Sequence, residues 1–250
     1  MEILRYFKKL ACFALIGLAP FAQAGETMIK NIVLVHGAFA DGSSYHKVVE
    51  RLQKKGYQVT AVQNPLTSLD ADVSAVKQVL DRQDGDVVLV GHSWGGVVIS
   101  EAGNHEKVKR LVYLSAIVPD SHETAAQALS RHGASGEGLT PDSRGVIWLP
   151  NAQVYQHVMA NDLPLNKASV LWATQTPIHA VAFNQAVAAP AWQSKPGFYL
   201  LTEQDNALPF KVQQSFAKMM NAKTQTVNSG HLSMLSRPEA VVRLIEQASQ

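Results

Sequence analysis

The stretch that most constrains this chain is residues 86–96, with the sequence DVVLVGHSWGG. Its four apolar residues at 87–90 run without alternation, which is typical of a strand buried on both faces of a parallel sheet. A turn with glycine at both ends (GHSWG, residues 91–95) follows at once, and a helix start follows the turn. This order predicts an α/β fold in which Ser93 stands at the end of an inner strand.

The turn makes Ser93 a candidate nucleophile. A G-x-S-x-G sequence between a buried strand and a helix is the context of the nucleophile elbow, where a strained turn lifts the serine hydroxyl above the sheet edge. Gly91 and Gly95 have no Cβ, so neighbouring backbone can pass close to them. The free N–H groups of the helix point to where an oxyanion would form. The alternative is a glycine-rich turn in which the serine has no catalytic role.

Residues 1–24 have the features of a secretory signal peptide. A short basic region precedes an apolar run, and Ala22-Gln23-Ala24 is an A-x-A cleavage site. The apolar run is short for a membrane span and contains Pro20. We therefore expect an exported protein, periplasmic or secreted, without a stable membrane anchor after cleavage. An uncleaved anchor is the alternative.

Cleavage at this site leaves residues 25–250 as one α/β domain, long enough to bury its own core. The single cysteine, Cys12, lies in the predicted signal, so the core must hold without disulfides. The signal contains three basic residues and one acidic residue, and its loss leaves 19 of each. A net charge of zero, with no basic tract, predicts no nucleic-acid partner.

Strands and helices alternate along most of the domain, which implies a parallel sheet with right-handed crossovers. Strands are expected at 31–35, 57–62, 87–90, 108–116, 198–202 and 224–227, and helices at 69–80, 209–220 and 238–248. Residues 120–189 break this rhythm: they show no clear strand and are cut by prolines, so they predict a small helical cap. Its aromatic residues are candidates for a substrate pocket, although packing in the cap core is their commoner role: Trp148, Tyr155, Trp172 and Phe183.

The short cap pieces also predict a modest cavity and not a long acyl tunnel. The few charged residues of the cap flank turns, so apolar side chains remain to line a pocket for uncharged esters. Activity is then expected to fall steeply once the acyl chain exceeds roughly eight carbons.

A serine nucleophile needs a base and an orienting acid. Among nine histidines, His231 follows a late strand and precedes the last helix, and none has metal-ligand spacing. Asp205 follows the penultimate strand, at the sheet edge where parallel folds collect functional groups. The order Ser, Asp, His matches the nucleophile-elbow fold. Asp120 is a rival acid at the same edge, and a surface loop is the alternative role for His231.

The oxyanion would be bound by two backbone N–H groups. One belongs to Trp94, directly after the nucleophile. The other comes from the loop after the first strand, where Phe39 is preferred and Ala38 is close behind. His36 and His92 lie beside glycines at strand ends and are expected to brace these loops. Ser115 and Ser121 are expected to be ordinary turn residues.

These stretches together resemble the α/β-hydrolase superfamily. The chain is similar to the branch shared by bacterial EstC-like esterases, plant methylesterases and hydroxynitrile lyases. The matching stretches span nearly the whole domain: VLVHGAFADGSSY, VVLVGHSWGG, LVYLSAIVPD, PAWQSKPGFYLLTEQDNALP and SGHLSMLSRPEAV. The resemblance implies a mostly parallel sheet flanked by helices, a triad of Ser93, Asp205 and His231, and an oxyanion loop at Ala38 and Phe39.

The resemblance implies a serine esterase that needs no cofactor or metal and acts on a small-molecule ester. The lyase members carry a lysine after the catalytic histidine, where this chain has Leu232, and a threonine in the oxyanion loop, where it has His36-Gly37-Ala38. A cationic lysine suits a cyanide leaving group, so its absence favours ester hydrolysis. The alternatives are a lyase or perhydrolase on the same triad, and a ligand-binding protein with little turnover.

Overall fold

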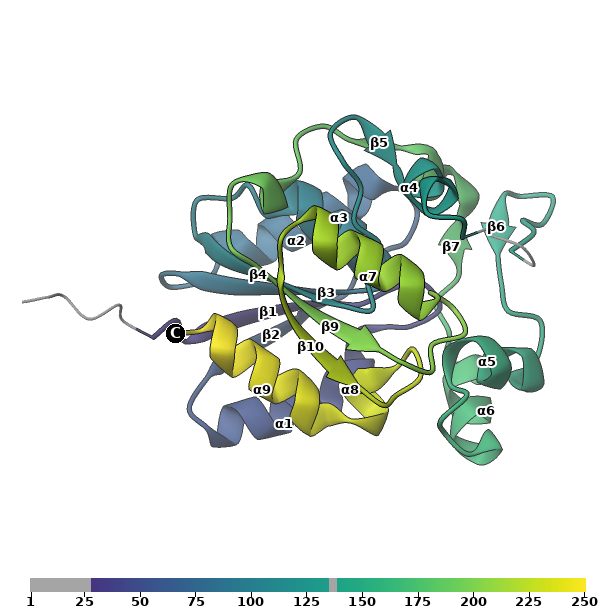
Figure 1. Ribbon diagram of the computed structural model, residues 1–250. Helices are drawn as coiled ribbons and strands as arrows, with labels where there is room; N and C mark the ends of the chain where they lie inside the picture. Colours follow the sequence, from purple (N-terminus) through teal and green to yellow (C-terminus); the bar gives the residue numbers. More distant parts are fainter. Residues whose placement is uncertain (1–27, 135–138) are drawn as a thin grey trace, which may run out of the picture.

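The computed structural model describes residues 28–134 and 139–250, and the predicted signal peptide lies outside them. Six parallel strands form the central sheet in the order β10-β9-β4-β3-β1-β2 (Figure 1). The strands are β1 (Asn31–Val35), β2 (Gln58–Val62), β3 (Val87–His92), β4 (Val108–Leu114), β9 (Gly197–Thr202) and β10 (Lys223–Val227). The sequence-based prediction of a mostly parallel α/β sheet is confirmed.

The position of each strand in the sheet follows from its composition. Every residue of β1 and β3 is buried, as expected for apolar runs covered on both faces. The edge strands β2 and β10 are mostly exposed or half-buried, and four of the five residues of β10 are polar. These two strands flank the apolar inner strands on both sides.

Helices cover both faces of the sheet (Figure 1). The pair α1 and α9 lies with α8 on one face, and α2, α3 and α7 lie on the other. Their bounds are α1 (His46–Lys54), α2 (Leu69–Asp81), α3 (Trp94–Ala102), α7 (Phe210–Met219), α8 (Ser233–Ser236) and α9 (Pro238–Ala248), with a 3-10 turn η1 (Gly42–Tyr45) before α1. The carboxyl ends of all six strands meet at one edge, where the predicted site residues lie.

The cap is more elaborate than its sequence predicts. It contains helices α4 (Ala125–Arg131), α5 (Ala152–Met159) and α6 (Leu165–Ala173) and the 3-10 turn η2 (Ala180–Asn184), and the 3-10 turn η3 (Ala191–Gln193) follows it. It also contains two antiparallel pairs of two-residue strands: β5 (Glu123–Thr124) with β8 (Ala186–Val187), and β6 (Val146–Ile147) with β7 (Ile178–His179). The expectation of no strand here was wrong, because such short pairs have no periodicity to detect.

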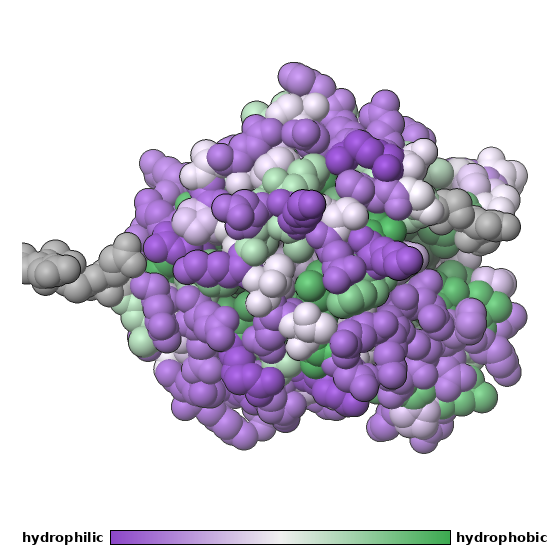
Figure 2. Space-filling model, in the orientation of Figure 1, coloured by the Kyte–Doolittle hydropathy of each residue, from purple (hydrophilic) through white to green (hydrophobic). Residues whose placement is uncertain are grey.

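The two ends of the described domain lie side by side, away from the cap. The amide of Ile29 donates to the carbonyl of Ser249 at 2.8 Å, and Figure 1 shows the C-terminus far from α5 and α6. The visible surface is largely hydrophilic, with scattered apolar areas (Figure 2). Within residues 28–134 and 139–250, no helix is long and apolar enough to cross a membrane.

Candidate active site

The turn after β3 places Ser93 in a strained conformation at the carboxyl edge of the sheet. Its φ and ψ are 52° and −120°, in a region that non-glycine residues rarely occupy. A Cβ on Gly91 would lie 2.5 Å from the carbonyl oxygen of Gly95, and one on Gly95 would lie 2.5 Å from that of Val35. Both glycines are therefore required by close backbone contacts, as the motif predicts.

The loops after β9 and β10 bring an acid and a base together. Nδ1 of His231 lies 2.7 Å from Oδ2 of Asp205, and the two side chains are 1% and 0% exposed. Ser93 and His231 line the same cavity. The rival acid, Asp120, lies elsewhere: its carboxylate accepts from the amide of Ser121 and the side chain of Gln193. The structure thus pairs His231 with Asp205 and not with Asp120.

Asp205 is held by four further hydrogen bonds. Its Oδ1 accepts from the amides of Ala207 and Leu208, both at 2.8 Å. Its Oδ2 also accepts from the hydroxyl of Thr202 at 3.0 Å and the amide of Gln213 at 3.1 Å. A carboxylate with this many donors is held in one orientation, which suits the role of orienting an imidazole.

Sequence reasoning missed the second layer of this network. Thr202 and Gln213 are fully buried and bond to each other as well as to Asp205. Ser115 was expected to be an ordinary turn residue, which was wrong: it is buried, has a φ of 44°, and its Oγ lies 2.9 Å from the hydroxyl of Thr202. The available signal was the polar end of β9 three residues before Asp205.

Two further histidines brace the loops. The amide of Asn64 donates to Nε2 of His36, and Nδ1 of His36 lies 2.9 Å from the carbonyl of Gly37. Nε2 of His92 lies 3.0 Å from the carbonyl oxygen of His231. Burial lowers the pKa of both rings, that of His92 well below 6.5. Both histidines are therefore neutral and structural.

The oxyanion loop differs from the expectation in one respect. The amide of Phe39, the preferred donor, is already bonded to the carbonyl of Thr176 at 3.1 Å. Phe39 has a φ of 59°, and its own carbonyl accepts from the hydroxyl of Tyr155 at 3.0 Å. The amide of Ala38 has no partner among the described residues. Trp94 is the first residue of α3, so its N–H has no acceptor within the helix. Ala38 and Trp94 are thus the available donors.

The side chain of Trp94 is anchored by a buried acid. Nε1 of Trp94 donates to Oδ2 of Asp72 at 2.7 Å, and Oδ1 of Asp72 accepts from the amide of Leu66 at 2.8 Å. Burial raises the pKa of Asp72 to about 6, against the two hydrogen bonds that lower it. Asp72 lies on the apolar stripe of α2, between Leu69 and Val76, which was the sequence signal for a buried acid.

A cavity of about 360 Å³, here called the Ser93 cavity, lies over the nucleophile. Its described lining is apolar except for Ser93, Asn206 and His231. Of the four aromatic pocket candidates, only Phe183 lines it. The other three differ from the expectation for physical reasons. Trp148 is 46% exposed, Tyr155 is buried against the oxyanion loop, and Trp172 donates to the carbonyl of Leu149.

Two other sequence expectations concern metals and lyase chemistry. Among residues 28–134 and 139–250, no group of three His, Cys, Asp or Glu residues could hold a metal ion. Leu232, which stands where the lyases carry lysine, is 1% exposed and is not among the residues that line the Ser93 cavity.

Fold, elbow and acid–base pair together define an α/β hydrolase, and the alpha/beta hydrolase family matches residues 32–244. The chain belongs to this family. It is 31% identical over 245 residues to the alpha/beta hydrolase nvfD of Aspergillus novofumigatus, covering 87% of this chain and 96% of that protein. It is 24% identical to methylesterase 3 of Arabidopsis thaliana, covering 88% and 96%.

Solved structures share the same fold. The crystal structure of polyneuridine aldehyde esterase aligns with a TM-score of 0.75 at 20% identity, covering 89% of this chain and 100% of that one. A pyrethroid hydrolase from Sphingobium faniae aligns with a TM-score of 0.72 at 22% identity, covering 88% and 96%. These relatives agree with the resemblance to the methylesterase branch.

Proposed function

We propose that this protein is a serine hydrolase that cleaves neutral carboxylic esters through an acyl-enzyme. The observation that carries the proposal is the buried 2.7 Å pair of Asp205 and His231 at the cavity that Ser93 lines. A buried carboxylate fixes the tautomer of the imidazole and stabilises the imidazolium that forms during the reaction. Several relatives named as esterases support the same activity.

The proposed reaction has two halves. Nε2 of His231 takes the hydroxyl proton as Oγ of Ser93 attacks the ester carbonyl, and the N–H groups of Ala38 and Trp94 bind the oxyanion. His231 then gives that proton to the leaving alcohol, and the acyl group stays on Ser93. Water, deprotonated by His231, attacks the acyl-enzyme and releases the carboxylic acid and free Ser93.

The substrate is inferred to be uncharged because the described lining of the Ser93 cavity offers no ion partner for a charge. Its described lining holds no Asp, Glu, Lys or Arg, and an unpaired buried charge costs several kcal/mol. The same argument disfavours free acids and phosphoesters as substrates.

The test combines active-site labelling with turnover. A fluorophosphonate is expected to label the wild-type protein rapidly and completely, and p-nitrophenyl acetate to be turned over many times. Ser93→Ala should abolish labelling and reduce kcat by roughly 10³-fold or more. Ser121→Ala, at an exposed serine in the segment after β4, is the matched control and should retain both.

Three results would count against this function. Labelling without multiple turnover would indicate a ligand-binding protein. Faster cleavage of mandelonitrile than of any ester would indicate a lyase. A Ser93→Ala variant that keeps a tenth of the wild-type rate, after contaminating esterases are excluded, would remove Ser93 as the nucleophile.

A further inference from the structure

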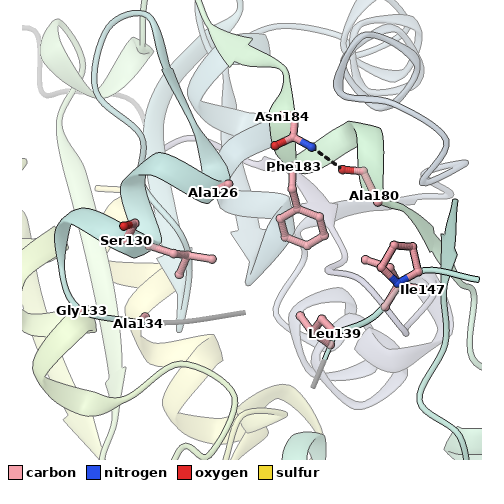
Figure 3. A pocket seen from close by; sticks show the side chains of 11 residues that line it. Ala126, Ser130, Gly133, Ala134, Leu139, Ile147, Ala180, Phe183 and Asn184 are labelled. Atoms are coloured by element: carbon pink, nitrogen blue, oxygen red, sulfur yellow. Dashed lines mark hydrogen bonds between the residues drawn. The ribbon is translucent and has the colours of Figure 1, made fainter. Parts of the chain in front are cut away.

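A second apolar hollow lies beside the Ser93 cavity, on the side of the cap formed by α4 and η2 (Figure 3). We call it the outer chamber. Its volume is about 470 Å³, and Ala126, Ile147 and Ala180 line it without lining the Ser93 cavity. It is therefore comparable in size to the cavity at the nucleophile and lies beyond it.

The two spaces have a common wall. Five described residues line both of them: Leu129 of α4, Gly133, Ala134, Leu139 and Phe183 of η2. Figure 3 shows the ring of Phe183 projecting from η2 into the middle of the lining residues. A side chain that faces both spaces means that they adjoin each other. The outer chamber is therefore the space next to the Ser93 cavity at this ring.

The ring of Phe183 is supported from behind by the elbow. Its centroid lies 5.2 Å from that of Trp94, whose indole is held by the buried Asp72. The tilted contact between the rings is a favourable aromatic geometry. The boundary between the two spaces is thus fixed to the catalytic elbow, at a defined distance from Ser93.

The chemistry of the outer chamber suits an uncharged apolar group. The only polar residues in its described lining are Ser130 and Asn184, and the side-chain amide of Asn184 already donates to the carbonyl of Ala180 at 3.3 Å. No charged residue belongs to that lining. A charged group there would find no partner of opposite charge in the described lining, whereas an apolar group would gain apolar contacts.

We infer that the outer chamber binds the distal apolar part of a neutral ester whose carbonyl lies at Ser93. This inference rests on the proposed function and extends it to a substrate class: esters with one apolar arm too long for the Ser93 cavity alone. The limit of about eight acyl carbons that the sequence suggested then moves to longer chains. Each additional methylene that reaches the chamber should strengthen binding about fourfold.

The test fills the outer chamber without touching the Ser93 cavity. Ala180→Phe and Ala126→Phe each place a ring in the outer chamber only. Val181→Phe is the matched control, since Val181 is the neighbour of Ala180, is 55% exposed and lines neither space. The kcat/KM values are compared for p-nitrophenyl butanoate and p-nitrophenyl dodecanoate below their aggregation concentrations, with thermal melting as the control for folding.

For the wild-type protein, dodecanoate should be hydrolysed at least as efficiently as butanoate. Both chamber variants should lose tenfold or more on dodecanoate and less than twofold on butanoate, and Val181→Phe should lose neither. Equal losses on the two esters, or no loss, would overturn the inference. So would a wild-type preference for butanoate by tenfold or more.

A binding experiment tests the outer chamber independently of the proposed function. Ser93→Ala, alone and combined with Ala180→Phe, is titrated with methyl decanoate and methyl butanoate while tryptophan fluorescence is followed. Weaker binding of decanoate alone in the combined variant supports the chamber even if the wild-type protein hydrolyses no ester. In that case the proposed function fails on its own. Unchanged binding of decanoate would overturn the chamber.

Discussion

The two halves of the cap contact the loops that carry the proposed catalytic residues in different ways. The α5–α6 hairpin is hydrogen-bonded to three of them, whereas the α4 side, residues 119–134 with the segment 178–187, has no polar contact with any of them among the described residues. The α4 side instead bonds to α2 through Gln185 and contacts α7 through Arg131. The hairpin thus both bonds to these loops and lines the Ser93 cavity with Val154, Val158 and Met159, whereas the α4 side lines the two cavities without bonding to the loops.

The contacts of the hairpin reach each loop in turn. Tyr155 bonds to the oxyanion loop at Phe39. Asn161 donates to the carbonyl of Gln204, directly before Asp205. Asp162 accepts from the amide of Gly230, directly before His231. The α4 side contributes apolar side chains to both cavities, so changes there should alter which esters fit and leave the alignment intact.

The largest expected effect separates the two candidate acids, Asp205 in the loop after β9 and Asp120 on the α4 side. Asp205→Asn should reduce kcat by about 10⁴-fold, because an amide in this place stabilises the wrong tautomer of His231. Asp120→Asn, on the α4 side, should change kcat less than twofold. Steady-state kinetics on p-nitrophenyl butanoate decides between them. An inactive Asp120 variant with an active Asp205 variant would reverse the assignment.

Asp72, the buried acid that holds the indole of Trp94, should make the free energy of unfolding depend on pH. The folded-state pKa of Asp72 is about 6 and its ordinary value is 3.8, so the folded protein binds this proton more tightly than the unfolded chain does. Its stabilising contribution is therefore full below pH 3.8 and is lost as the pH rises through 6. The loss between pH 4 and 7 should be about 2 kcal/mol.

Urea unfolding of the wild-type protein and of Asp72→Asn measures this contribution, since other carboxylates titrate alike in both proteins. The difference in unfolding free energy, wild type minus variant, should fall as the pH rises from 4 to 7. A difference that stays constant with pH would contradict the raised pKa. Because both carboxylate oxygens accept hydrogen bonds, an amide satisfies only one of the two donors.

A smaller effect tests the alignment role of the hairpin. Tyr155→Phe removes the hydroxyl that bonds to the carbonyl of Phe39, and one buried hydrogen bond of this kind corresponds to about tenfold in kcat. Since the oxyanion loop acts in the chemical step, KM should stay nearly constant, and esters of all lengths should be affected equally. On the α4 side, Leu129→Ala should instead change the ratio between long and short esters. An effect of Tyr155→Phe that depends on ester length would contradict this difference between the hairpin and the α4 side.

The smallest effect concerns the support of the His231 loop. Asp162→Ala should lower kcat about threefold, because the amide of Gly230 and the hydroxyl of Ser229 lose their acceptor. Asp162→Asn should restore the rate, since one oxygen suffices for these donors and Oδ1 of Asp162 has no partner. Glu123→Ala breaks an ion pair on the α4 side and should leave kcat unchanged. Equal losses in the alanine and asparagine variants would point to charge in place of a hydrogen bond.

The sequence predicted those parts of the molecule that depend on local patterns. Buried strands, the glycine-bounded turn at Ser93 and the order of Asp205 and His231 are all readable from neighbouring residues. The parallel sheet and its helices follow from their alternation. That Asp205 lies beside His231 could be predicted because each of them follows a strand, and the two strands end at the same edge of the sheet.

What escaped prediction depends on residues far apart in the sequence. The amide of Phe39 is taken by Thr176, and Ser115 joins Thr202, through contacts that no local pattern records. The two-residue strands of the cap pair segments separated by long stretches of chain. Whether Tyr155 packs on a loop or faces a cavity likewise depends on how the hairpin sits on the sheet.

The bond between Ile29 and Ser249 has a practical consequence for engineering. Because the two ends of the domain touch at the edge opposite the cap, a short linker could join them into a closed chain. New ends opened at the exposed turn of residues 82–86 would lie between α2 and β3, at the amino ends of the strands. A circular permutant of this design, or an enzyme immobilised through residue 250, presents its cavity to the solution without obstruction.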